Sequence, residues 1–227
     1  MTQTTETLPS HVRLAVPLED MRRLKPFIST EETRYYLQGV HFETGGEGTL
    51  LVATDGHRLG VYKSDRAICA SAGTVRVPAY IKRAVKKKEL WFVVGTFAGA
   101  ELSLVLEFPE NGKAADIAKL ASLSDALAIY ANPVIIGEYP NWRKVIPSKT
   151  GTCAGAFNSK YLGSFAQVSP GRTAIAAHGT EPTAPHLIEI PGEENFVGVL
   201  MPMRHKSIYK IPSWLDAPKA KRARKAA

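Results

Sequence analysis

The sequence repeats one pattern three times: a short strand, a helix, and then about three strands. The repeats open near Val12, Val75 and Ala154, at intervals of roughly 60 to 80 residues. Pro17 and Pro78 stand at the first turn of the first two predicted helices, where the missing N–H of proline costs nothing. Strands that follow one another through short turns pair antiparallel, so the pattern predicts an α+β fold built from repeated strand–helix–strands modules.

The first repeat contains a predicted β-hairpin. Apolar and polar residues alternate up to Phe42, residues 45–48 are mostly glycine, and Leu50–Ala53 is a second apolar run. Asp55 and Gly56 end this run in a tight turn, and a third strand is expected at 60–63.

The second and third repeats are less regular. Strands are predicted at 90–94 and 102–106, with a turn over Gly95–Gly99 between them. Residues 110–131 form an insertion, and its apolar residues have helical spacing, which predicts one amphipathic helix through Ile117, Leu120, Leu123 and Leu127. In the third repeat Asn158 is a candidate N-cap for a helix that runs through Phe165.

The charge of +8 invites a polyanionic partner, but much of it is local. Five cations lie within Lys219–Lys225, and the rest of the chain carries only about +3. We expect a basic tail at 211–227 that is solvated or touches DNA nonspecifically, and a flexible leader at 1–10.

Other classes find little support. Asp55 and His57 lie in one turn, but no Ser or Cys nucleophile motif accompanies them, and no spaced His pair or glycine-rich phosphate loop is present. We predict a protein that is not an enzyme and needs no cofactor or metal. No apolar run is long enough to span a membrane and no secretory signal is visible, so we expect no membrane partner and a cytoplasmic location, with Cys69 and Cys153 as free thiols.

Four segments carry a resemblance to a known family. Arg34–Val40 and Ala53–Leu59 resemble the middle domain of the bacterial DNA polymerase III beta subunit, the sliding clamp. Tyr139–Pro147 is similar to the segment that closes that domain, and Val199–Arg204 to the family's C-terminal end. The resemblance covers residues 11–205. It implies the DNA-clamp fold, with antiparallel sheets outside and helices lining an inner face.

The resemblance also implies a domain plan. Residues 11–147 would be a middle-domain-like pair of modules with the inserted helix at about 110–131, and residues 148–210 part of a C-terminal domain. The member would be shortened, lacking the first domain and part of the last, and such a reduced architecture suggests a phage, plasmid or other mobile-element version. Twelve modules per ring and about three per chain favour a tetramer, with a trimer or dimer as alternatives.

Two surfaces follow from the resemblance. Cations on the helices would face DNA, although a charged helical face is often only solvated, and a tyrosine pair at a strand start is often only packed. The residues assigned to double-stranded DNA, without sequence preference, are Arg22, Arg23, Lys25, Arg34, Tyr35, Tyr36, Lys82, Arg83, Lys86, Lys87 and Lys160.

The second surface is an apolar pocket for short linear peptides of a DNA polymerase, the clamp loader or repair proteins. Core packing is the alternative for each residue taken singly. The assigned pocket residues are Leu37, Thr54, Gly56, His57, Arg58, Leu59, Pro140, Val145, Val199, Met201, Pro202, Met203 and Arg204.

The resulting hypothesis is a processivity factor that encircles duplex DNA as a homo-oligomeric ring and tethers its partners through the pocket. Two alternatives use the same residues differently. A monomeric clamp mimic would sequester clamp-binding proteins without encircling DNA, and a poison subunit would cap a host ring.

Overall fold

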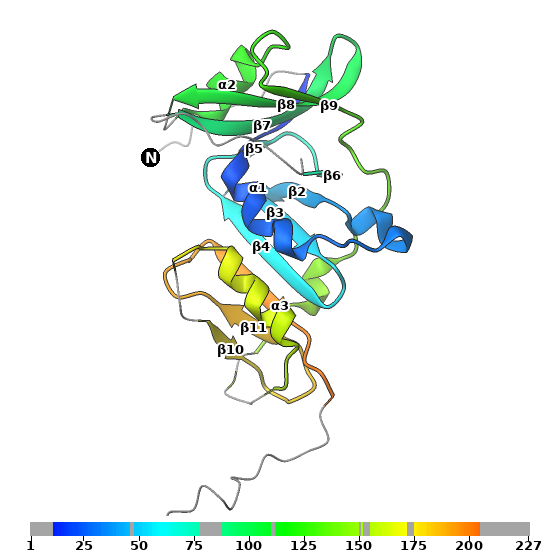
Figure 1. Cartoon of the computed structure of the whole chain (residues 1–227), viewed down its shortest axis with the longest axis vertical. Helices are drawn as coiled ribbons and strands as arrows, with labels where there is room; N and C mark the ends of the chain where they lie inside the picture. The colour runs from blue at the N-terminus through cyan, green and yellow to red at the C-terminus, as the bar shows by residue number, and fades with distance from the viewer. Residues whose placement is uncertain are drawn as a thin grey trace, which may run out of the picture.

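The computed structural model describes residues 11–45, 48–77, 88–109, 112–149, 151, 155–171 and 175–204. It has an elongated shape, with two antiparallel sheets arranged along the long axis (Figure 1). The leader, the basic tail, Cys153 and the helix predicted after Pro78 lie outside these ranges. Within them, no helix is long and apolar enough to cross a membrane.

The first sheet has five strands. Its centre is formed by β1, β7 and β8, with Ala15 opposite Val93 and Leu104 opposite Ile129 at the β9 side. Helix α2 (Ala114–Leu120) buries Ile117 and covers one apolar face of this sheet. The strand order is β5 (Ile68–Cys69), β1 (Val12–Pro17), β7 (Lys88–Phe97), β8 (Ala100–Pro109) and β9 (Ala128–Ala131).

The second sheet has seven strands and joins the first repeat to the third. The junction is the antiparallel pairing of β12 with β4, in which Val199 lies opposite Leu59 and Gly198 opposite Gly60. The order is β10 (Ala176–His178), β11 (His186–Glu189), β12 (Phe196–Leu200), β4 (Arg58–Ser64), β3 (Gly48–Thr54), β2 (Val40–Gly45) and β6 (Gly73–Val75).

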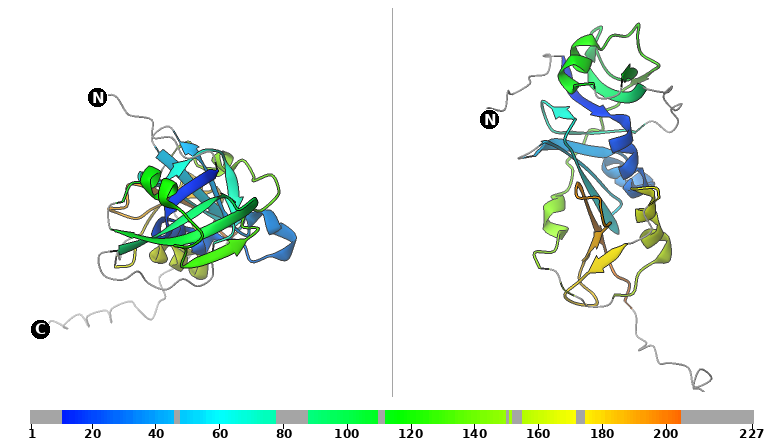
Figure 2. Two further views of the ribbon diagram at one scale, coloured as in Figure 1. Left: turned by 90° about the horizontal axis from the view of Figure 1, so that it is seen from above. Right: turned by 90° about the vertical axis from the view of Figure 1, so that its left-hand side faces the viewer.

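The helical segments divide between the two faces of this sheet. Helix α1 (Leu18–Leu24) and helix α3 (Ser159–Ser164) lie on one face, and the 3₁₀ turn η3 (Trp142–Val145) lies on the other (Figure 2). α1 is followed by η1 (Lys25–Phe27), and α3 by η4 (Phe165–Gln167).

The sequence explains which face of α1 is buried and where α3 begins. Leu18, Met21 and Leu24 are buried at the predicted helical spacing. The Asn158 side chain accepts a hydrogen bond from the Lys160 N–H at 3.0 Å, which confirms the predicted N-cap.

Three aromatic rings hold the first and third repeats together. The Phe27 ring lies 5.0 Å from that of Phe165 and 5.9 Å from that of Phe196, centroid to centroid. The paired glycines of β4 and β12 make room for two of them. A Cβ on Gly60 would lie 2.8 Å from the Phe27 ring, and one on Gly198 would lie 2.4 Å from the Phe165 ring.

Three sequence-based expectations were wrong in detail. The turn after β7 is Ala98–Gly99 rather than 95–99, because cross-strand pairing continues to Phe97. The insertion is not one helix, since α2 ends at Leu120 and the chain then enters β9. Leu127 is consequently exposed. The third correction concerns η2 (Glu32–Leu37), which is a 3₁₀ segment where a strand start was expected.

Candidate functional site

The turn between β3 and β4 is fixed by its own side chains. One carboxylate oxygen of Asp55 accepts from the backbone N–H of His57 at 2.9 Å and of Arg58 at 3.0 Å. The other oxygen accepts from Arg58 Nε at 3.1 Å. The Thr54 hydroxyl accepts from the Gly56 N–H at 3.1 Å and donates to the Arg58 carbonyl at 2.8 Å. These bonds make the turn a rigid platform.

Gly56 allows η2 to dock against this platform. Its φ is +88°, and a Cβ there would lie 2.5 Å from Arg34 Nη1. That nitrogen donates to the Asp55 carbonyl at 3.0 Å, while Arg34 Nε lies 3.1 Å from the Glu31 carboxylate. The contact brings the end of η2, with Leu37, beside the turn.

A third wall comes from residues 139–146, held on the outer face of the seven-stranded sheet. The Tyr139 ring stacks on His41 at 4.5 Å, and its hydroxyl donates to the Val52 carbonyl at 3.4 Å. Arg143 pairs with Glu43. Burial raises the pKa of Tyr139 and lowers that of His41.

These walls enclose a cavity of about 370 Å³, within the range of ligand pockets. Its buried floor includes Leu59, Trp142 and Val199. The cavity contains ten of the thirteen predicted pocket residues: Leu37, Thr54, Gly56, His57, Arg58, Leu59, Pro140, Val145, Val199 and Met201. Four further lining residues were not predicted for the pocket: Arg34, Tyr36, Asn141 and Trp142.

The remaining three predicted pocket residues lie past the cavity. Pro202, Met203 and Arg204 follow β12, and the Met203 N–H donates to the Ala156 carbonyl at 2.7 Å. Met203 is exposed, and this contact ties it to the start of the third repeat. The cavity therefore ends at Met201.

Tyr161 of α3 connects the cavity to the opposite face of the sheet. Its ring stacks on His57 at 5.5 Å and lies 4.8 Å from the guanidinium carbon of Arg58. Sequence reasoning missed this role, because it placed Tyr161 only inside the helix predicted from Asn158 through Phe165. Asn141 and Trp142 lie within the Tyr139–Pro147 segment that carries the family resemblance, and their position in this segment was the available signal for a role in the pocket.

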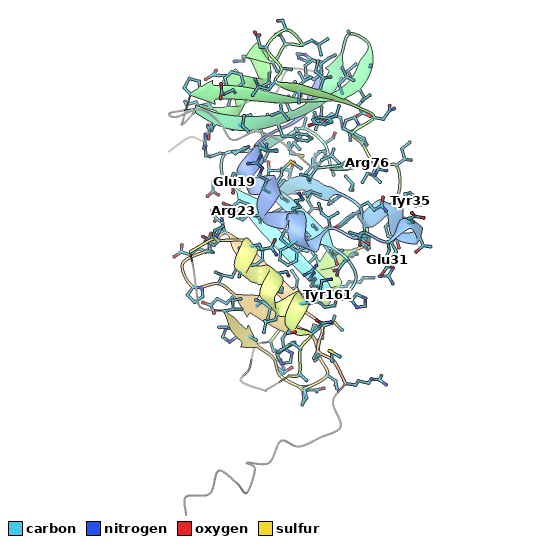
Figure 3. The ribbon with its side chains drawn as sticks, in the orientation of Figure 1. Glu19, Arg23, Glu31, Tyr35, Arg76 and Tyr161 are labelled. Carbon is cyan, nitrogen blue, oxygen red and sulfur yellow. The ribbon has the colours of Figure 1, made fainter. Side chains whose placement is uncertain are left out.

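The described residues among those predicted to bind DNA differ in their contacts and exposure. Arg23 is turned into a contact between α1 and the third repeat, whereas Lys25 and Lys160 are exposed on the helical face. Tyr35 is 52% exposed at the η2 tip, on the other side of the view from Arg23 (Figure 3). Arg22 lies 3.6 Å from Glu19, Arg34 and Tyr36 line the cavity, and Lys82, Arg83, Lys86 and Lys87 are outside the described ranges.

The chemical character of the cavity follows from the side chains that line it. Across the described ranges, no three His, Cys, Asp or Glu side chains are grouped to hold a metal ion. The pocket offers an apolar floor with guanidinium, imidazole and hydroxyl groups at its walls. That composition suits an apolar peptide with a few polar contacts.

The two antiparallel sheets and the helices on one face define the class: this is the DNA-clamp fold. The fold is shared with the solved sliding clamp of Bartonella birtlesii bound to griselimycin, at a TM-score of 0.58 and 16% identity, over 90% of this chain and 69% of that one. Residues 19–89 match the family model of the central domain of the DNA polymerase III beta subunit.

Curated relatives agree with this class. The beta sliding clamp of Caulobacter vibrioides is 34% identical over 146 residues, covering 60% of this chain and 34% of that protein. The Salmonella typhimurium clamp is 28% identical over 142 residues, covering 61% and 34%. The chain thus spans about a third of the length of these relatives. Together the matches show that the chain is similar to bacterial beta sliding clamps over part of its length and shares their fold.

Proposed function

We propose that the chain is a DNA sliding clamp, a non-enzymatic cytoplasmic processivity factor that encircles duplex DNA as a homo-oligomeric ring. In this proposal the cavity binds short peptides of a DNA polymerase and a clamp loader. The observation that carries it is the cavity itself, because segments far apart in the sequence converge there on a rigid turn. Such a preformed apolar pocket suits a linear peptide.

Griselimycin is one probe for this proposal, because a solved sliding clamp is bound to it, and its binding at this cavity is part of what we propose. We expect labelled griselimycin and a polymerase-derived clamp peptide to bind the chain in fluorescence polarisation. Val145→Asp should abolish both, since Val145 lines the cavity and its 42% exposure lets the variant fold. Leu127→Asp is the matched control, because Leu127 is similarly exposed on the other sheet. Equal binding by both variants would contradict the pocket.

The monomeric clamp mimic is a second candidate, and one observation favours it. Helix α3 carries Lys160 as its one cation, and Arg23 of α1 is committed to an internal contact. A pocket-only protein needs no cationic inner face. Light scattering behind a sizing column separates the two: a species near four chain masses supports a ring, and a monomer at micromolar concentration supports the mimic.

DNA retention then tests encirclement. A closed ring should remain on a nicked circular plasmid and leave it after linearisation, whereas a surface binder should leave both forms alike. Retention that ignores DNA topology would contradict the ring.

A further inference from the structure

The sequence beyond the last described residue contains a compact apolar segment. In residues 205–227 every large apolar side chain falls between Ile208 and Leu215, and the cluster of cations comes only later. Trp214 and Leu215 are adjacent, and Asp216 follows them. A short apolar stretch of this kind has the chemistry of a linear peptide ligand, whereas a solvated tail is typically polar throughout.

The cavity has exposed apolar side chains at its walls and a buried donor without an acceptor among the described residues. Val145 and Met201 line it and remain 42% and 39% exposed. Trp142 is only 7% exposed, and its indole N–H finds no acceptor among the described residues. A buried donor without an acceptor is unfavourable, and a peptide carbonyl entering the cavity would supply one once the wall adjusts. The thioether of Met201 makes such adjustment easy.

The described chain ends beside this cavity. Met201 is a lining residue, Arg204 is the last described residue, and the apolar segment begins four residues later at Ile208. The ten residues from Arg204 to Trp214 span up to roughly 33 to 36 Å when extended. Met201, three residues before Arg204, lines the cavity, so this reach is the basis for expecting that the segment can return to it.

We propose that residues 208–215, with Trp214 and Leu215 as anchors, occupy the peptide cavity of their own chain. This inference rests on the pocket proposed above and adds its regulation: the chain competes with external partners for its own binding site. Charge is complementary as well, because Asp216 would follow the anchors to a wall where the Arg34 side chain is 39% exposed.

The size of the effect follows from effective concentration. A segment tethered to its own site by a short linker has an effective concentration of about 1 mM there. If the isolated segment binds with a Kd of about 0.1 mM, the tether weakens external ligands about tenfold. An incoming partner with several contacts would still displace it.

The test compares full-length chains. Trp214→Ala/Leu215→Ala should bind labelled griselimycin about tenfold more tightly than the parent chain. A control with the five cations at Lys219, Lys221, Arg222, Arg224 and Lys225 changed to Gln should bind like the parent. A synthetic peptide of residues 207–217 should displace the label from the double variant, and the same peptide with both anchors changed to alanine should not.

Each outcome decides the inference. Equal griselimycin affinity in parent and double variant overturns self-occupancy while leaving the pocket intact. Failure of both griselimycin and the polymerase-derived clamp peptide to bind either chain refutes the pocket itself, and is thereby distinguishable. A gain that appears only as protein concentration rises assigns the segment to a neighbouring chain and overturns occupancy in cis.

Discussion

Replacing Arg23 with Met should have a larger effect on the free energy of unfolding than on the free energy of DNA binding. Arg23 Nη1 donates to the Val168 carbonyl at 2.8 Å and lies 3.5 Å from the Glu193 carboxylate, and the guanidinium carbon of Arg23 is 5.3 Å from the Tyr62 ring centroid. A hydrogen bond from a charged donor contributes about 1.5–3 kcal/mol. The side chain is 23% exposed and its Nε has no partner among the described residues, which favours the lower end, about 1.5–2 kcal/mol.

Thermal unfolding followed by circular dichroism measures this loss. For a chain of this size each kcal/mol lowers Tm by about 2–4 °C, so we expect a decrease of roughly 3–8 °C. Arg22→Met is the control, because Arg22 makes an i,i+3 pair with Glu19 worth about 0.2–0.5 kcal/mol. An unchanged Tm for the Arg23 variant, together with weakened DNA retention, would refute the reasoning and return Arg23 to the DNA surface.

Three further predictions concern the DNA surface, the pocket turn and pH. Charge reversal of the second repeat's basic cluster should weaken DNA retention and flatten its salt dependence without changing griselimycin affinity. The cluster is Lys82, Arg83, Lys86 and Lys87. A loss of griselimycin binding would show that these residues are assigned to the wrong surface. Gly56→Ala should cost about 1–2 kcal/mol from its positive φ and displace Arg34, seen as a lower Tm and weaker griselimycin binding; full affinity would contradict the platform. His41 has its pKa lowered by burial, so the stability that it contributes above the unfolded pKa of about 6.5 is lost as pH falls through the folded pKa. Tm should drop from pH 7.5 to 5.5 more steeply in the parent than in His41→Asn, and equal slopes would argue against this.

Much of the strand and helix pattern could be predicted because it depends on local chemistry. The strand β1, the hairpin of β2 and β3, and the Asn158 cap all follow from alternation, turn residues and a capping side chain. β9 could not be predicted, because Ile129 lies at the sheet edge with its side chain half exposed and no clean alternation marks it. The short η2 segment likewise has no periodicity long enough to read.

The site shows the same division between local and distant contacts. The Thr54–Leu59 turn could be identified from its own motif, since its bonds are made within the motif. The stacking of Tyr161 on His57 could not, because it depends on how α3 docks across the sheet. Whether Arg34 belongs to DNA or to the pocket also depended on this packing, and the structure places its side chain at the cavity wall.

The pairing of β4 with β12 has a consequence for synthesis of the chain. Tyr62 of β4 pairs with Phe196 of β12, so this pairing cannot form until Phe196 has left the ribosome. At 5–20 residues per second the delay is on the order of ten seconds, during which one edge of β4 stands without its neighbour. An open strand edge invites pairing with other nascent chains. The soluble yield of this protein should therefore depend on whether the edge of β4 is protected until β12 has been synthesised. Lower growth temperatures or a co-expressed chaperone should raise that yield.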